Sequence, residues 1–523
     1  MVADVGEEKF QKYRTMAEVV EELKTTADIG FPTAAMSLVN YLRNMVMVVC
    51  MGRMGSLELA GGALAVGFTN ITGYSVLSGL AMGMEPLCSQ AFGSQNYAVA
   101  FLTLQRTVLI LLFASFPIAL LWFNLEPLML ILRQNQDITR IASLYCRFAI
   151  PDLVANSLLP PLRIFLRSKG TTWPLMWSNL LAMFFHIPIT IFLTFKLSLG
   201  VQGIAISTFL TNFITLFFLL FYLYFSSYTP KEQEDYSCNN NNNWMINTPF
   251  FPKSWPNIFL TTATIWENWG VLIRLAIQSC LAVCLEWWWY EFMTILAGYL
   301  PNPKVALATS AIVIQTTALM YTLPFSLSAS VSTRIGNELG AGRPNKARLA
   351  AIVAVGLALI TSLVGLLWTT LGRKPWGRVF TQDHEVLELT TLVLPIIGVC
   401  ELANCPQTTS CGILRGTARP GIGAAINFYA FYLVGAPVAV VLGFVWKLGF
   451  VGLCYGLLAA QIACVVSILT VVYKTDWERE SAKAKELVAR GRDHHDHHVF
   501  DHADHKKVLK CCEEGVAFLI DEN

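Results

Sequence analysis

The sequence has little charge for its length. Only 14% of its 523 residues are charged, whereas a soluble domain carries about 25%. Hydrophobic residues make up 54% of the chain, and they fall in blocks of roughly 20, the length at which a helix crosses about 30 Å of hydrocarbon. The low charge therefore argues against a set of soluble domains and predicts an all-α polytopic membrane protein.

Other absences exclude further classes of function. The net charge of +2 indicates no nucleic-acid partner. Most of the 13 cysteines lie in apolar blocks, and their spacing indicates neither a zinc site nor a disulfide framework. We find no metal-ligand pair and no nucleophile–base pair in the apolar blocks, so we expect no enzyme, no metal and no cofactor. The segment up to Asp28 lacks an uninterrupted apolar core, so we expect no cleaved signal peptide.

Twelve apolar stretches are candidate membrane spans. They lie at residues 31–51, 66–88, 101–123, 143–165, 173–195, 201–225, 271–300, 306–331, 349–371, 387–413, 422–445 and 451–473. Because twelve is even, both termini lie on one side of the membrane. The tails are rich in Lys and Arg, which the positive-inside rule places in the cytoplasm, although Arg373, Lys374 and Arg378 fall on the opposite side.

A polar insert with an Asn run at residues 239–243 separates the sixth and seventh spans and is typical of a linker. The His-rich C-terminal tract can bind zinc or nickel loosely, but a solvated tail is the simpler interpretation. Cys511 and Cys512 are candidate palmitoylation sites. We therefore divide the chain into a cytoplasmic N-terminal segment 1–28, an N-lobe of six helices 29–228, a cytoplasmic linker 229–265, a C-lobe of six helices 266–474, and a disordered cytoplasmic tail 475–523.

The two halves of the chain resemble each other. Gly93 and Gly340, in matching stretches after the second and eighth spans, lie 247 residues apart. The segments LSLGVQG at 197–203 and WKLGFVG at 446–452 match at an offset of 249, and Arg167 to Pro174 resembles Arg415 to Pro420. These matches predict two parallel six-helix repeats, a design in which two bundles rock about a central site.

Two carboxyl groups lie in the middle of apolar spans. Glu286 belongs to the seventh span and Glu401 to the tenth. A charge at that depth costs at least about 2.5–3.5 kcal/mol, so it is expected to be paired, to face water or to have a function. We expect both glutamates to carry protons in transport. The alternative is a protonated Glu that bonds a neighbouring helix. Glu291, closer to the end of the seventh span, is a weaker candidate.

The surroundings of Glu286 predict a substrate cavity. Trp289 and Tyr290, three and four residues after Glu286, share its helix face and are suited to stacking on a flat or cationic ligand. Trp287 and Trp288 are interpreted equally well as lipid-facing anchors. In the first half, Asn40 and Arg43 interrupt the first span, and Asn40 is the counterpart of Glu286 in the repeat; Asp152 lies in the fourth span. We add Asn404 and Gln315 to the expected cavity lining.

Prolines lie within several spans. Pro395 and Pro406 bracket Glu401, and Pro32 lies in the first span. Proline removes a backbone hydrogen bond and can kink a helix. We expect helix hinges at these three positions, although many prolines in membrane helices only shape packing.

Three stretches resemble signatures of the multidrug and toxic compound extrusion (MATE) family: EPLCSQAFGSQNY, STRIGNELGAGRPNKAR and the segment from Cys400 to Pro437. CLEWWWYEFM is similar to the plant branch of detoxification efflux carriers. The resemblance covers about residues 28 to 475, and it implies a two-lobed, V-shaped carrier of twelve helices. In plant members, acidic residues of the seventh and tenth helices are thought to carry coupling, and they match Glu286 and Glu401. Where many members have AIPSC, this chain has Gln278.

The leading hypothesis is a proton-coupled antiporter that exports organic solutes such as secondary metabolites, hormones, xenobiotics or organic acids. It implies a small organic substrate, membrane lipid as surroundings, a monomer, and a proton gradient in preference to sodium. The alternatives are a lipid or lipid-linked flippase, which needs a basic cavity and for which Arg43 is the only candidate within an N-lobe span, and a non-transporting membrane sensor or scaffold. The plasma membrane is favoured over vacuolar and other endomembranes.

Overall fold

The protein is helical throughout the part of the chain that the structure describes. The computed structural model describes residues 2–131, 135–228 and 269–489, and no strand occurs within these ranges. Eleven helices are long and apolar enough to cross a membrane. The all-helical prediction is therefore confirmed, and its physical basis is that a helix satisfies all its backbone hydrogen bonds internally in hydrocarbon.

The first half of the chain supplies six long helical segments. The fourth is not among the eleven apolar helices; it is α7 (Gln136–Ser168), which carries several charged residues along its length. It is the twelfth long helix, in agreement with the predicted count. The elements are α1 (Val2–Met54), the interrupted second segment α2 (Ser56–Thr69), η1 (Asn70–Tyr74), α3 (Ser75–Met82) and α4 (Glu85–Gly93), then α5 (Tyr97–Phe123), α6 (Leu125–Ile131), α7, α8 (Trp173–Ile191) with η2 (Phe192–Lys196), and α9 (Val201–Tyr228).

The second half follows the same plan. Proline begins several of its helices, as its fixed φ favours. The elements are α13 (Trp269–Ala297), α14 (Pro303–Gly340), α15 (Pro344–Leu371), α16 (Arg373–Phe380), α17 (His384–Gly416), α18 (Pro420–Asn427), η3 (Phe428–Gly435), α19 (Ala436–Val440), η4 (Val441–Val445) and α20 (Phe450–Tyr473).

Irregularities of the backbone recur in both halves. The short helices α6 and α16 follow the third and ninth long segments, and the π-helical turns η2 and η4 end the fifth and eleventh. Residues with left-handed backbone conformation also come in equivalent pairs, 247 to 249 residues apart: Gln95 and Gly342, Gly170 and Ala418, Ser198 and Lys447, Gly200 and Gly449. The repeat predicted from three short sequence matches therefore extends to the local geometry of the loops.

The two halves meet at one end of the bundle through equivalent contacts. Gln90 Nε2 donates to the carbonyl of Gly416 at 3.0 Å, and Asn337 Nδ2 donates to the carbonyl of Ser168 at 3.2 Å. Gly93 packs against the backbone of Asn337, and Gly340 packs against the backbone of Gln90, so that neither position has room for a Cβ atom. Glycine at these two positions therefore allows α4 and α14 to approach closely.

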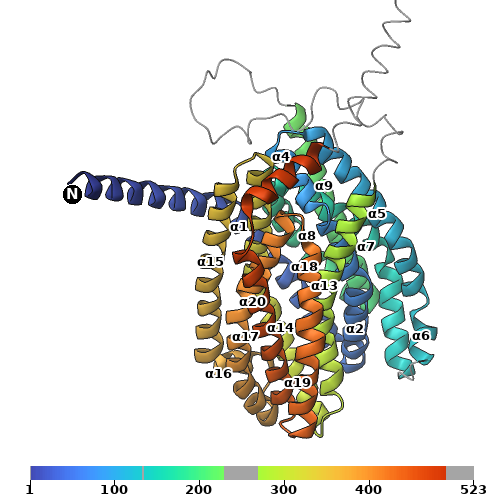
Figure 1. Cartoon of the computed structure of the whole chain (residues 1–523). Coiled ribbons are helices and arrows are strands. Elements are labelled where there is room, and N and C mark those ends of the chain that lie inside the picture. The colour runs from blue at the N-terminus through green and yellow to red at the C-terminus, as the bar shows by residue number, and fades with distance from the viewer. Residues whose placement is uncertain (1, 132–134, 229–268, 490–523) are drawn as a thin grey trace, which may run out of the picture.

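A further helix over residues 477–489 corrects the prediction of a disordered tail from residue 475. It lies at the upper end of the bundle in Figure 1, here called the tail side. Trp477 and Ala484 pack in an apolar cluster with residues of α14, α15 and α17, and Ser481 Oγ donates to the carbonyl of Leu339 at 3.4 Å. These apolar contacts stabilise the helix. The high proportion of charged residues in this segment led to the prediction of disorder. The predicted linker 229–265, the His tract and Cys511 with Cys512 lie outside the described residues.

Candidate transport site

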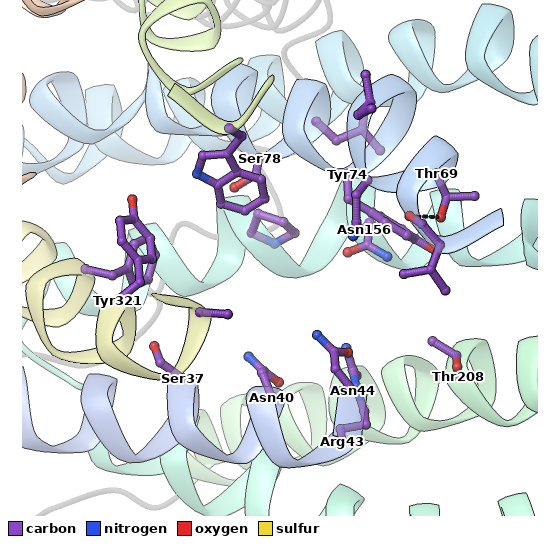
Figure 2. Close-up of a pocket in the computed structure, with 18 of the residues that line it drawn as sticks. Ser37, Asn40, Arg43, Asn44, Thr69, Tyr74, Ser78, Asn156, Thr208 and Tyr321 are labelled. Atoms are coloured by element: carbon purple, nitrogen blue, oxygen red, sulfur yellow. Dashed lines mark hydrogen bonds between the residues drawn. The ribbon is translucent and has the colours of Figure 1, made fainter. Parts of the chain in front are cut away.

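A cavity of about 540 Å³ lies between the two halves. Helices α1, α2, α3, α7 and α9 with η1 line it from the first half, and α13 and α14 line it from the second. Figure 2 shows Asn40 and Asn44 of α1 facing Tyr74 and Asn156 across the open space, with Tyr321 of α14 on another side. Its size falls within the range of about 300–1,000 Å³ that is usual for small-molecule sites.

The wall from the first half centres on Asp152. This carboxylate is 1% exposed, and it accepts hydrogen bonds from Tyr74 Oη at 2.8 Å, Asn156 Nδ2 at 2.9 Å and Asn212 Nδ2 at 2.6 Å. Asn212 Oδ1 in turn accepts from Arg43 Nη1 at 2.6 Å. Arg43 and Asn40 both line the cavity, where the sequence places them. Like Glu286, Asp152 is an ionisable residue within an apolar span, but the sequence-based prediction assigned it no role.

Arg163 is a second cation of this wall. Arg163 falls within the predicted fourth span 143–165, yet the sequence-based prediction names Arg43 as the only basic candidate within an N-lobe span. That interpretation is wrong, because Arg163 of α7 also lines the cavity. Only the packed helix shows which side of α7 faces the cavity.

The wall from the second half is an arc of α13. Glu286 is 7% exposed and lines the cavity together with Tyr290 and Glu291. Trp287 and Trp288 also line it, so of their two interpretations the structure favours the cavity one. Because consecutive helical residues are about 100° apart, Glu286 stands at one edge of this arc.

Trp289 does not belong to the cavity, contrary to prediction. It lies on the other side of Glu286, is fully buried, and packs with Phe431 and Tyr432 at ring-centroid distances of 5.8 and 6.1 Å. The sequence gives the spacing between Glu286 and Trp289 but not the side of the glutamate on which the cavity opens. Trp289 is therefore part of the hydrophobic core of the second half.

Glu401 lies behind the cavity wall rather than in it. It is 3% exposed, and Asn404 Nδ2 donates to its two carboxylate oxygens at 3.2 and 3.1 Å. Neither Asn404 nor Gln315 lines the cavity, which corrects two predicted positions. Asn404 is one helical turn from Glu401 on α17, and this spacing brings its amide to the carboxylate instead.

A chain of polar side chains joins the two glutamates. Gln407 Nε2 lies 3.5 Å from Glu286 Oε2, and the hydroxyl of Thr408 lies 3.5 Å from Gln407 Oε1 and 3.4 Å from Asn404 Oδ1. Asn404 then reaches Glu401. Sequence reasoning missed Gln407 and Thr408, although both are polar residues in an apolar span, because their partners come from the packing of α13 against α17.

The predicted hinges lie inside continuous helices. Pro395 and Pro406 are internal to α17, and Pro32 is internal to α1. Pro406 directly precedes Gln407 of the polar chain. Whether α1 and α17 bend at these prolines is a matter of motion, so the hinge assignment stays a prediction.

The cavity is closed toward the tail side by a buried ion cluster. Glu85 of α4 accepts from Arg167 Nη2 at 2.7 Å, and from Arg415 Nε of the other half at 3.1 Å. Arg415 Nη2 also donates to Ser328 Oγ at 2.8 Å. Glu22 of α1 pairs with Arg334 of α14 at 2.7 Å in the same region. These contacts tie the two halves together at one end.

Comparison with known proteins agrees with this architecture. The MatE family model matches residues 32–192 and 279–441, two stretches that start as far apart as Gly93 and Gly340. Two Arabidopsis thaliana relatives are Protein DETOXIFICATION 55, which is 63% identical over 504 residues with 96% of each chain covered, and Protein DETOXIFICATION 48, which is 45% identical over 481 residues with 92% of this chain and 86% of that one covered.

Solved structures share the fold. The crystal structure of the eukaryotic MATE transporter AtDTX14 superposes with a TM-score of 0.80 at 29% identity, over 90% of this chain and 100% of that one. The Vibrio cholerae MATE transporter VcmN in its bent form superposes at 0.71 with 16% identity over 90% and 99%, a likeness of fold alone. With its two matched repeats and its central cavity, the chain belongs to the MatE family of membrane transporters.

Proposed function

We propose that this transporter is a proton-coupled antiporter that exports small organic solutes by alternating access. Glu286 is the proton site that faces the cavity, and Glu401 is the inner proton site. The observation that carries the proposal is the chain of polar side chains between them, which begins at the cavity and ends at a carboxylate held by Asn404. Two ionisable carboxyl groups are costly to place within a membrane span, so their presence there indicates a function.

The polar chain links the protonation of the two glutamates to their packing. The amides of Gln407 and Asn404 are not proton carriers, but each donates a hydrogen bond that a carboxylate accepts better than a protonated carboxyl group does. Gln407 belongs to α17 and reaches Glu286 of α13, so a small shift of either helix lengthens its 3.5 Å contact to Glu286. Protonation at Glu286 and the packing of the second half are therefore linked, and this link is what an antiporter requires.

Alternating access requires the tail-side contacts to separate. The ion pairs of Glu85 and the bonds of Gln90 and Asn337 all cross between the halves, and all lie at one end. Rocking of the two equivalent bundles about the cavity breaks this set of contacts and opens the path to the site from the tail side. We place the transporter in the plasma membrane as a monomer driven by protons rather than sodium.

The test is solute accumulation by the full chain in proteoliposomes. The probe is a methanol extract of Arabidopsis leaf, with solutes quantified by mass spectrometry after an acid-inside pH gradient is imposed. We expect at least one solute to accumulate inside and a protonophore to abolish this accumulation. A sodium gradient at equal pH on both sides is expected to give none.

Glu286→Gln and Glu401→Gln are expected to remove the gradient-driven accumulation of that solute. Glu388→Gln is the matched control, because Glu388 lies on the same helix as Glu401 with its side chain 78% exposed. Wild-type rates for both buried variants contradict the assignment of proton sites. Accumulation driven by sodium alone contradicts proton coupling.

A further inference from the structure

The two walls of the cavity carry opposite charge. Six ionisable acidic or basic side chains, apart from tyrosines, line it in the described part of the chain: Arg43, Arg163, Arg167 and Asp152 from the first half, and Glu286 and Glu291 from the second. All the cations belong to one wall, and the other wall holds only acids. The cavity therefore presents a dipole to whatever it binds.

Two of the three cations of the first wall have no ion-pair partner among the residues that the structure describes. Arg167 is paired with Glu85 at 2.7 Å, so its charge is compensated. Asp152 is the only acidic residue that this wall contributes to the lining in the described part of the chain, and its hydrogen bonds come from three neutral donors. The wall thus carries two guanidinium groups, Arg43 and Arg163, and one carboxylate that neither of them contacts directly.

Unused hydrogen-bond donors mark the same place. Arg43 Nε is buried without a hydrogen-bond partner. Arg163 is half-buried and makes no hydrogen bond or ion pair to any residue that the structure describes, so its donors face the cavity. A charged donor without a partner favours the binding of an acceptor. A planar guanidinium suits a carboxylate, which it can bind through two parallel hydrogen bonds. An anionic group between Arg43 and Arg163 balances the charge of both.

The opposite wall suits a cation beside a flat ring. Glu286 and Glu291 are separated along the helix by Trp287, Trp288 and Tyr290, which also line the cavity. Aromatic faces attract ammonium groups, and they stack on planar apolar bodies. Tyr321 and Phe325 of α14 add two further rings to this side.

We propose that the transported solute is dipolar: a flat, apolar body with an anionic group held by Arg43 and Arg163 and a protonated amine held by Glu286 and Glu291. This inference rests on the proposed function and names its substrate class. It also explains the direction of coupling. A proton on Glu286 removes the counter-charge of the amine, so proton and solute compete for one wall, as antiport requires.

Four indole compounds test the proposal at equilibrium, without any gradient. Tryptophan carries both charges, tryptamine only the cation, indole-3-propionate only the anion, and tryptophol neither. Binding to the purified full chain is measured by equilibrium dialysis with mass-spectrometric detection. We expect tryptophan to bind about tenfold or more tightly than each of the other three, since each charge-assisted contact contributes to binding.

Variants then assign each end of the solute. Arg163→Gln and Arg43→Gln are expected to remove the preference for tryptophan over tryptamine, and Glu291→Gln the preference over indole-3-propionate. Arg53→Gln is the control, because Arg53 lies on α1 in an exposed position away from the cavity. Arg163 has no described bonding partner to lose, so its variant is expected to fold.

The outcomes separate this proposal from proton coupling. Equal binding of all four compounds, absence of binding by any, or preference for tryptamine overturns the dipolar substrate, as does unchanged discrimination in Arg163→Gln. If Glu286→Gln transports at the wild-type rate in proteoliposomes, the proton site is wrong instead. The equilibrium preference for tryptophan still measures the substrate class in that case.

Discussion

Gln90 and Asn337 hold equivalent places in the two halves of the transporter, and each donates its side-chain amide to a backbone carbonyl of the opposite half. The acceptors, Gly416 and Ser168, are themselves equivalent in the repeat. The contact is therefore nearly symmetric, and closing the tail side forms both bonds together. The ion pairs of Glu85 break this symmetry, because arginines of both halves bind one carboxylate of the first half.

The first prediction concerns Glu85. Glu85→Gln leaves Arg167 and Arg415 without their shared counter-charge in a buried site. Removing one partner of a buried ion pair costs about 3–5 kcal/mol, so we expect the thermal unfolding midpoint in detergent to fall by several degrees. Spin labels at Gln95→Cys and Asn345→Cys, at exposed tail-side positions of the two halves, are expected to report a population with a longer separation.

An exposed ion pair provides the control for Glu85. Glu126 lies 3.5 Å from Arg147, and their side chains are 38% and 42% exposed. Exposed pairs contribute at most about 1 kcal/mol, so Glu126→Gln is expected to leave the unfolding midpoint and the label separation nearly unchanged. If the two variants lose equal stability, the tail-side cluster does not hold the halves together.

The second prediction uses one equivalent pair of loop residues. Gly170 and Ala418 both have left-handed backbone, with φ of 84° and 57°. A residue with a Cβ atom loses roughly 1–2 kcal/mol in that region. We therefore expect Ala418→Gly to raise the unfolding midpoint and Gly170→Ala to lower it. No atom lies within 4 Å of the Cβ that Gly170→Ala adds, so steric crowding does not contribute to its effect. A higher unfolding midpoint in both variants contradicts the prediction.

The third prediction separates two neighbouring tryptophans. Trp289→Ala empties a fully buried core position, and such a change typically costs about 3–5 kcal/mol. Trp288 is 40% exposed at the cavity, so Trp288→Ala is expected to leave the unfolding midpoint within a few degrees of the wild type while weakening the binding of indole compounds. Thermal unfolding and equilibrium dialysis on the same samples check both. If Trp289→Ala weakens indole binding and Trp288→Ala lowers the unfolding midpoint, the assignment of the two tryptophans is wrong.

The fourth prediction concerns the C-terminal helix. Truncation after residue 489 removes residues 490–523 and keeps the helix 477–489, so it is expected to preserve the unfolding midpoint. Truncation after Asp476 removes Trp477 and Ala484 from the apolar cluster that they form with α14, α15 and α17, and it removes the ion pair of Arg419 with Glu480 at 3.7 Å. We expect this shorter chain to unfold at a lower temperature. Equal midpoints for the two truncations contradict a structural role of this helix.

Much of the architecture follows from the sequence alone. Apolar blocks of membrane-spanning length determine the helices, because hydrocarbon leaves the backbone no other partner. Matching loop motifs indicate the repeat, and the equivalent loops have left-handed backbone at equivalent positions, although the residue types differ in most pairs. Glu286 and Glu401 can be identified from the sequence because each lies in the middle of an apolar span. The cost of a charged side chain depends on its depth in the membrane, and position within the span indicates that depth.

The tertiary structure decided which side of each helix faces the cavity. Sequence spacing relates Trp289 to Glu286 but leaves the rotation of α13 open, and that rotation buries the tryptophan. For the same reason the sequence does not show that Arg163 faces the cavity, or that Gln407 links the two glutamates, which depends on the packing of α13 against α17. A charge in a membrane span is costly wherever it points, so the sequence reveals that charge. Its partner is chosen by packing between segments far apart in the chain, and only the folded molecule brings them together.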